Sequence, residues 1–217
     1  MSSLKLKHSG GNSVSLNPPT SAPTSSEVAF KLPTADGSAG QVLQTDGSGN
    51  LSWVTPGLVH TDSWRLASDW AGATGTNHIN AGWERDDTNF ELIGTGLSHD
   101  GSGKFGFQAT GKYLLTFFYS GAILSGNDTR YAGIRVYAAT DGISGTYSEI
   151  AQSLDSVKGT DSGSTYAAGS IQKVLDITNT NTYFYISSYT TGSVTWRLSG
   201  NSSLNNNGFT SIKLGDT

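Results

Sequence analysis

The sequence contains no cysteine, and this absence excludes two common ways of stabilising a small protein. A disulfide scaffold needs paired thiols, and structural zinc or iron–sulfur centres use thiolates as ligands. With neither available, stability must come from a buried core and from oligomerisation. We expect no cofactor and no bound metal ion.

Charge is scarce as well, because only 14% of the 217 residues are charged and the net charge is −4. A nucleic-acid-binding protein needs a basic face toward the phosphates, whereas the lysines and arginines here are scattered. No apolar run approaches the length of a transmembrane helix, and the opening MSSLKLKHSGG lacks the apolar stretch of a secretory signal. These features predict no nucleic-acid partner, no membrane partner and synthesis in a host cytoplasm.

Proline is absent after Pro56, although the first 56 residues contain all five prolines. The asymmetry divides the chain into residues 1–56 and residues 57–217. Apolar residues of the first segment alternate with polar ones, but they are too few to form a core, and each would contribute about 1.5–3 kcal/mol if buried. We interpret this segment as an extended attachment arm of short strands and turns, with a disordered tail as the alternative. The candidate attachment residues are Leu4, Leu6, Val28, Phe30, Leu32, Val42 and Leu43.

Glycine, serine, threonine and asparagine are abundant, and apolar runs with helical spacing are missing. This composition is typical of short strands joined by turns, and it predicts an all-β fold with two antiparallel sheets packed as a jelly-roll sandwich. The expected strands of the second segment are 62–66, 89–93, 104–108, 112–124, 131–138, 148–154, 170–178, 182–189, 194–198 and 209–214.

The segment GKYLLTFFYSGAIL, residues 111–124, is apolar on both faces of the strand that it predicts. A fully covered central strand is one explanation. The other, which we favour, is an aromatic face that packs on identical neighbours, because interfaces are rich in Tyr and Phe. The segment TYFYISSY, residues 182–189, repeats the pattern. The predicted trimer-interface residues are Tyr113, Leu115, Phe117, Tyr119, Tyr183, Tyr185 and Tyr189.

The stretch GTGLSHDGSGKFGFQATGKYLLTF, residues 94–117, resembles the globular heads of the tumour-necrosis-factor and complement superfamily. A short strand bearing Phe precedes a T-G-x-Y lead-in to a long central strand, and the matching residues are Phe105, Phe107, Thr110, Gly111 and Tyr113. The resemblance implies a jelly-roll head over residues 57–217, assembled as a homotrimer, whose shared residues are not catalytic.

The C-terminal segment NNNGFTSIKLGDT is similar to the ending of virus-borne copies of that domain, through Thr210, Ile212, Leu214, Gly215 and Asp216. The arm, with LKLKHSGGNSVSLNPPTSAPTSS and LPTADGSAGQVLQTDGSGNLSWV, is similar to leaders on particle proteins of marine tailed phages. These resemblances imply a bacteriophage virion structural protein, a trimeric capsid decoration protein or short head-fibre knob at the virion surface. Its arm would bind the major capsid protein or another virion protein. The alternative is a tail-fibre or tail-appendage tip that binds a host surface glycan.

Residues with catalytic or metal-binding chemistry are few and dispersed. The four histidines, His8, His60, His78 and His99, are far apart, and no G-x-S-x-G motif is present. The DGSG runs at 46–49 and 100–103 are interpreted as turns, since no helix follows to hold a phosphate and carboxylates occur only in pairs. The sequence therefore predicts that the protein is not an enzyme, and a depolymerase would need paired acids on a long solenoid.

Three tryptophans lie in an irregular stretch, residues 62–83, with several Asn and Asp residues. Indole rings stack on sugar faces, so these side chains are candidates for glycan contact. The alternative is that they belong to the core or to an interface. The three residues are Trp64, Trp70 and Trp83.

Overall fold

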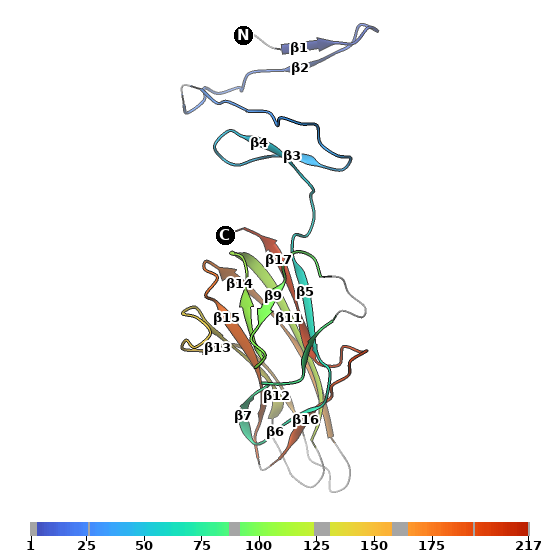
Figure 1. Ribbon diagram of the computed structural model, residues 1–217, viewed down its shortest axis with the longest axis vertical. Helices are drawn as coiled ribbons and strands as arrows, with labels where there is room; N and C mark the ends of the chain where they lie inside the picture. Colours follow the sequence, from blue (N-terminus) through green and yellow to red (C-terminus); the bar gives the residue numbers. More distant parts are fainter. Residues whose placement is uncertain are drawn as a thin grey trace. The chain divides into compact units, whose positions relative to one another are not determined.

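The computed structural model describes residues 4–25, 27–86, 92–123, 131–157, 165–192 and 194–216. The chain divides into two compact units, the arm unit (Met1–Gly57) and the head unit (Leu58–Thr217) (Figure 1). Strands, turns and loops make up all of the described residues. Within these ranges there is no helix of the length and apolarity that would cross a membrane.

Two small hairpins form the strands of the arm unit. They pair β1 (Leu4–Lys7) with β2 (Ser13–Leu16), and β3 (Val42–Thr45) with β4 (Leu51–Val54). Residues directly opposite each other in an antiparallel pair lie on one face. In the first hairpin the pairs Leu4–Leu16 and Leu6–Val14 therefore form an apolar face, and the lysines and serines form the other.

The second hairpin of the arm packs against the segment that precedes it in the chain. The indole Nε1 of Trp53 donates a hydrogen bond to the carbonyl of Ala35 at 3.0 Å, and Lys31 forms a parallel bridge with Asn50. A Cβ at Gly37 would lie 2.5 Å from the Trp53 ring, so only glycine allows this close approach.

Two antiparallel sheets form the head unit, with the long strands of each lying side by side (Figure 1). The seven-stranded sheet has the order β6 (Trp70–Gly72), β16 (Trp196–Leu198), β11 (Gly111–Ile123), β17 (Gly208–Gly215), β5 (Thr61–Leu66), β8 (Trp83–Arg85), and β14 (Thr165–Ile177) also pairs with β11. The six-stranded sheet has the order β13 (Ser148–Ser156), β12 (Tyr131–Ala139), β15 (Tyr183–Thr190), β10 (Lys104–Phe107), β9 (Leu97–His99), and β7 (Gly75–His78) also pairs with β15.

The order β5-β17-β11-β14 in one sheet and β10-β15-β12-β13 in the other is that of a jelly roll, in which sequence neighbours are separated in space. The predicted all-β, two-sheet antiparallel sandwich is thus confirmed. The C-terminal strand β17 fills the centre of its sheet, between β5 and β11.

The core between the two sheets is unusually aromatic. Phe105 lies at its centre, with its ring centroid 4.7 Å from that of Phe209, 5.1 Å from Trp64 and 5.5 Å from Phe184. Such edge-on and offset pairs each add about 0.5–1.5 kcal/mol beyond the area that they bury. The buried cluster of the described residues runs from Trp64 to Phe209 and so lies wholly in the head.

Nine of the ten predicted head strands match observed strands, with ends that differ by a few residues. The tenth, 89–93, falls mostly on residues outside the described ranges, and Ile93 itself forms only an isolated bridge with Thr61. Four short strands, β6, β7, β8 and β9, were not predicted. They are only three or four residues long, which is too short for an alternation of apolar side chains to mark them.

Candidate interaction surfaces

The four residues of β11 that were predicted to form a trimer interface lie inside the sandwich. Tyr113, Leu115, Phe117 and Tyr119 are only 0–3% exposed, and Tyr113 packs on Phe107 of the facing sheet with ring centroids 4.8 Å apart. A side chain that is already buried within one chain has no surface left for a second copy. The prediction is therefore wrong for these four residues, because alternation shows that a strand has two faces and not which one points inward.

The opposite face of β11 forms an apolar surface on the outside of the seven-stranded sheet. Across the paired strands, Leu114 lies opposite both Val174 of β14 and Ile212 of β17, with Phe118 further along β11. Val174 and Leu214 are each 56% exposed. We call Leu114, Phe118, Val174, Ile212 and Leu214 the apolar face.

The apolar face carries few charges along its length. The one register row of this face that lies between Leu114 and Phe118 contains Gln172, Thr116 and Thr210, which are polar but uncharged. An ion pair between Lys112 and Asp176, at 3.1 Å, lies at one end. An apolar centre with charges at its margin is the composition of a protein–protein interface.

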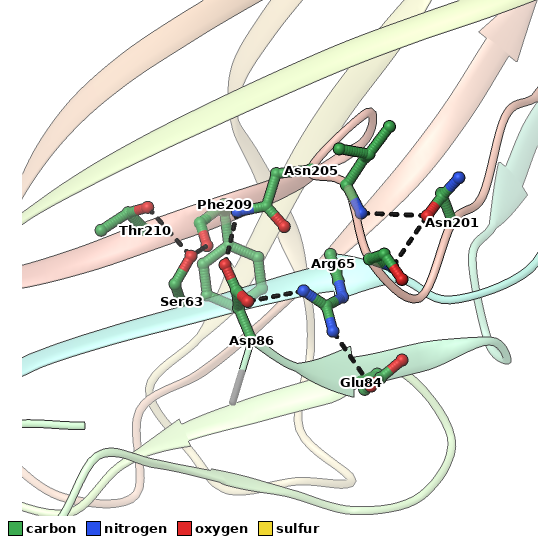
Figure 2. A network of polar contacts seen from close by, with 10 residues as sticks. Ser63, Arg65, Glu84, Asp86, Asn201, Asn205, Phe209 and Thr210 are labelled. Atoms are coloured by element: carbon green, nitrogen blue, oxygen red, sulfur yellow. Dashed lines mark hydrogen bonds and ion pairs between the residues drawn. The ribbon is translucent and has the colours of Figure 1, made fainter. Parts of the chain in front are cut away.

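A polar network lies beside the apolar face, on β5, β8 and the loop before β17 (Figure 2). The buried guanidinium of Arg65 donates to Asp86 at 2.5 Å and to Glu84 at 3.1 Å. The side-chain amide of Asn205 donates to the other oxygen of Asp86 at 2.6 Å. Ser63 and Thr210 link β5 to β17 through their hydroxyls, 3.3 Å apart. The network joins strands and a loop, and the single guanidinium of Arg65 is paired with two carboxylates.

The predicted interface tyrosines of β15 lie on the other sheet, where they face outward and are partly buried. Tyr185 stacks on Tyr137 of β12 with ring centroids 5.1 Å apart and planes 13° apart. Tyr147 and His78 also contact Tyr185, at 4.9 and 4.4 Å. We call these four residues the tyrosine cluster. It lies on the outer face of the six-stranded sheet, so the seven predicted interface residues do not share one surface.

Charged and polar groups surround the tyrosine cluster. The guanidinium of Arg135 lies 3.7 Å from the ring centre of Tyr189, and Lys104 Nζ lies 4.9 Å from that of Tyr147. Burial, as the largest cause, raises the pKa of Tyr147 to about 12, with nearby negative charge from Asp100 adding to it. The pKa of Tyr185 is raised as well, again mainly by burial.

Sequence reasoning missed Tyr137 and Tyr147, the two rings that complete this cluster. Tyr137 follows Arg135 by two residues, which places both on the face opposite the buried Ile134 and Val136. The alternation of residues in YAGIRVYAA was the sequence signal that could have identified Tyr137 as an outward-facing residue. Tyr147 lies in the loop between β12 and β13, and its contact with Tyr185 of β15 joins segments far apart in sequence.

The three tryptophans predicted to contact glycan pack on the core instead. Trp64 is 7% exposed and donates from its indole Nε1 to Asp62, while Trp83 packs on Phe105 at 5.3 Å. Trp70 is partly buried against the same core cluster. The glycan prediction is therefore wrong for Trp64, and the rings of Trp70 and Trp83 are engaged with the core.

Asp62 organises a buried ionic site behind these tryptophans. Its carboxylate accepts hydrogen bonds from Arg85 at 2.9 Å, from Trp64 at 3.0 Å and from the backbone amide of Leu97 at 2.7 Å. Arg85 in turn lies 4.7 Å from the ring centre of Trp64. The site fixes the register of β5, β8 and β9. Because the Asp62 carboxylate is engaged by three donors, we assign it a structural role.

The histidines of the head serve as packing groups. His60 is buried edge-on against Tyr113 with centroids 5.2 Å apart, and its Nε2 lies 3.2 Å from Ser211 Oγ, a hydroxyl with no exposure. His99 stacks on Phe105 at 4.8 Å. Burial lowers the pKa of His60, His78 and His99. Among the described residues, no group of three His, Asp or Glu side chains is placed to hold a metal ion.

The candidate attachment residues of the arm are all exposed. Leu4, Leu6, Val28, Phe30, Leu32, Val42 and Leu43 retain between 45% and 73% of their surface in contact with solvent. A groove of about 390 Å³ lies in the same unit, lined by Leu32, Pro33, Leu51, Trp53 and neighbouring residues. The arm thus presents apolar surface that its own strands do not cover.

No protein-family model matches the chain, and no match was found among curated proteins. Solved structures similar to it include Eiger TNF from S. frugiperda, with 13% identity, 74% of this chain and 96% of that chain covered, and a TM-score of 0.48. Murine APRIL at pH 8.5 is also similar, with 14% identity, coverage of 71% and 98%, and a TM-score of 0.43. The jelly-roll architecture of the head is established by its own strand order.

Proposed function

We propose that the chain is a non-enzymatic structural protein of a bacteriophage particle, a trimeric knob that an N-terminal arm attaches to the virion surface. The arm would bind the major capsid protein or another virion protein, and the head would decorate the capsid or form a short head fibre. The observation that carries the proposal is the contrast between a head with a complete core and an arm whose apolar side chains remain exposed.

The first hairpin of the arm is the best-defined attachment element. All four side chains of its apolar face, Leu4, Leu6, Val14 and Leu16, are at least 60% exposed. An isolated two-stranded hairpin is marginally stable in water, and burial against a partner would contribute about 1.5–3 kcal/mol per apolar side chain. These properties suit a segment that becomes ordered on binding.

The apolar face of the head supports self-association. Interfaces between permanent partners are apolar at the centre and poor in charge, which describes Leu114, Val174 and Ile212 and the uncharged residues beside them. We therefore propose the outside of the seven-stranded sheet as the trimer interface, in place of Tyr113 and its buried neighbours. The virion location is supported by the resemblance of the arm to leaders of phage particle proteins.

A tail-appendage tip that binds host glycan is the second candidate, and the tyrosine cluster is the feature that favours it. The two candidates differ in what the arm and the head each do. A decoration protein needs the arm for its function, whereas a receptor-binding tip needs the outer surface of the head.

Paired arm variants test the first candidate. Purified protein is mixed with particles that lack it, and the particles are sedimented. Leu4→Ser with Leu6→Ser removes half of the apolar face of the hairpin and should abolish co-sedimentation. Lys5→Ser with Lys7→Ser changes the opposite face of the same strand and should leave it intact. A chain lacking residues 1–56 that still binds particles would contradict the proposal.

A further inference from the structure

The tyrosine cluster combines aromatic rings with polar groups that are incompletely bonded. It occupies an outer face of the head, and Tyr137, Tyr147, Tyr185 and His78 converge there from two strands of the sheet centre, an edge strand and a loop. We propose that the tyrosine cluster is a binding site for the pyranose rings of a neutral oligosaccharide. The inference rests on the second candidate function, for which it names the ligand class, and it does not depend on the arm.

Each ring of the cluster has few aromatic contacts apart from the one with Tyr185. Tyr185 is at the centre and touches the other three rings. Tyr137 and His78 each have Tyr185 as their only aromatic neighbour within the described ranges, so the second face of each ring is not covered by another ring. The π face of an aromatic ring is negative and attracts the C–H groups on the face of a sugar.

Beside the rings, Arg135 and Glu149 have hydrogen-bonding capacity to spare. Arg135 Nη1 is 3.5 Å from both Glu149 Oε2 and Thr76 Oγ1, beyond the usual range of about 2.7–3.2 Å. Arg135 Nε is buried and has no hydrogen-bond partner among the described residues, so the guanidinium could meet a ligand only through its outer nitrogens. The Tyr137 hydroxyl donates to Glu149 at 3.3 Å, also a long contact. Sugar hydroxyls donate and accept, so they can bond to the guanidinium and the carboxylate together.

The balance of charge favours a neutral saccharide over a protein or an acidic ligand. Arg135 and Glu149 offset each other, and Lys104 is already bonded to the carbonyl of Ile143 at 2.8 Å and placed over the Tyr147 ring. A second copy of the chain would meet charges at the centre of such an interface, where they are normally depleted. The apolar face of the other sheet is the better surface for self-association.

Saturation-transfer NMR with the full-length chain tests the proposal. The probes are neutral hexasaccharides: maltohexaose, cellohexaose, mannohexaose and chitohexaose. At least one should receive saturation, strongest at its ring C–H protons. Titration of that probe should then show that Tyr137→Ala weakens binding at least about tenfold, because a stacking ring is lost. Glu149→Gln should weaken binding less.

Tyr166→Ala is the matched control, because Tyr166 is 74% exposed on β14 of the other sheet, and this variant should bind as the parent does. The proposal is overturned if none of the four probes receives saturation. It is also overturned if Tyr166→Ala and Tyr137→Ala lose the same amount of binding affinity. A change of oligomeric mass in Tyr137→Ala would make the surface a protein interface and overturn it as well. If Tyr137→Ala does not fold, the comparison of Glu149→Ala with Tyr166→Ala decides in the same way.

Discussion

Asp46 and Asp100 make the same pair of hydrogen bonds in two hairpins that belong to different units of the chain. In each, Oδ1 accepts from the backbone amides two and four residues later, at 2.8 and 3.1 Å for Asp46 and at 2.7 and 2.9 Å for Asp100. Both turns have the sequence DGSG, and both glycines of each have positive φ. The carboxylates that could have suggested a calcium or phosphate loop are used to close turns.

Replacement of Asp100 by Ala should destabilise the head by about 1 kcal/mol, because two backbone amides lose their acceptor. Asp100→Asn keeps an acceptor oxygen and should cost less. Urea unfolding followed by tryptophan fluorescence measures both. Asp46→Ala is the matched control, since it removes the same bonds in the arm and should leave the unfolding of the head unchanged. Equal effects of Asp100→Ala and Asp100→Asn would contradict the role assigned to the carboxylate.

The buried pair Arg65–Asp86 gives a second prediction (Figure 2). Arg65→Ala leaves Asp86 buried without its cation, and breaking such a pair costs about 3–5 kcal/mol. Removing both charges with Arg65→Met and Asp86→Leu should cost clearly less than Arg65→Ala alone, because no buried charge remains. Denaturant unfolding of the parent, of Arg65→Ala, of the double variant and of its two single components, Arg65→Met and Asp86→Leu, measures this. A double variant that loses as much as the sum of Arg65→Met and Asp86→Leu would show that the pair is not coupled.

Most of the fold could be predicted from local alternation and turn residues. The arm hairpin of Leu4 and Leu6 with Val14 and Leu16, and the long central strand from Gly111, follow from period-two patterns. Gly111 has a φ of +143°, and a Cβ there would lie 2.3 Å from the side chain of Lys213. Glycine is therefore required at this position, where the T-G-x-Y pattern predicted the start of the central strand. Such features are local, and the sequence carries them directly.

The candidate surfaces were harder to predict, because they depend on which face of each strand is covered. Tyr113 and Leu114 are adjacent and both apolar, yet the first is buried in the core and the second lies on the outer face. The tyrosine cluster also depends on the register that places Tyr137 opposite Tyr185 across β12 and β15. Pairing between distant segments settles both points, and no local pattern contains that information.

The three histidines of the head, of which His60 is buried and His78 and His99 are partly buried, predict that the head loses stability as the pH falls. Burial lowers the pKa of His60, His78 and His99 in the folded state, so the unfolded chain binds more protons once the pH drops below about 6.5. Stability should be complete above pH 7 and should decline from there to pH 5.5. Urea unfolding at half-unit pH steps measures the slope. His60→Phe should reduce the slope, and a stability that is constant over this range would contradict the prediction.

A new charge on the apolar face should dissociate the proposed trimer. Val174 is 56% exposed, so Val174→Glu leaves the folding of one head unaffected but places a carboxylate in the proposed interface, where its burial without a partner is costly. Light scattering after size exclusion should give three times the chain mass of 22.7 kDa for the parent protein and one chain mass for the variant. Gln152→Glu adds the same charge to an exposed position of β13, on the six-stranded sheet, and should remain trimeric. A parent protein with the mass of one chain, or a Val174→Glu variant that stays trimeric, would remove the apolar face as the site of assembly.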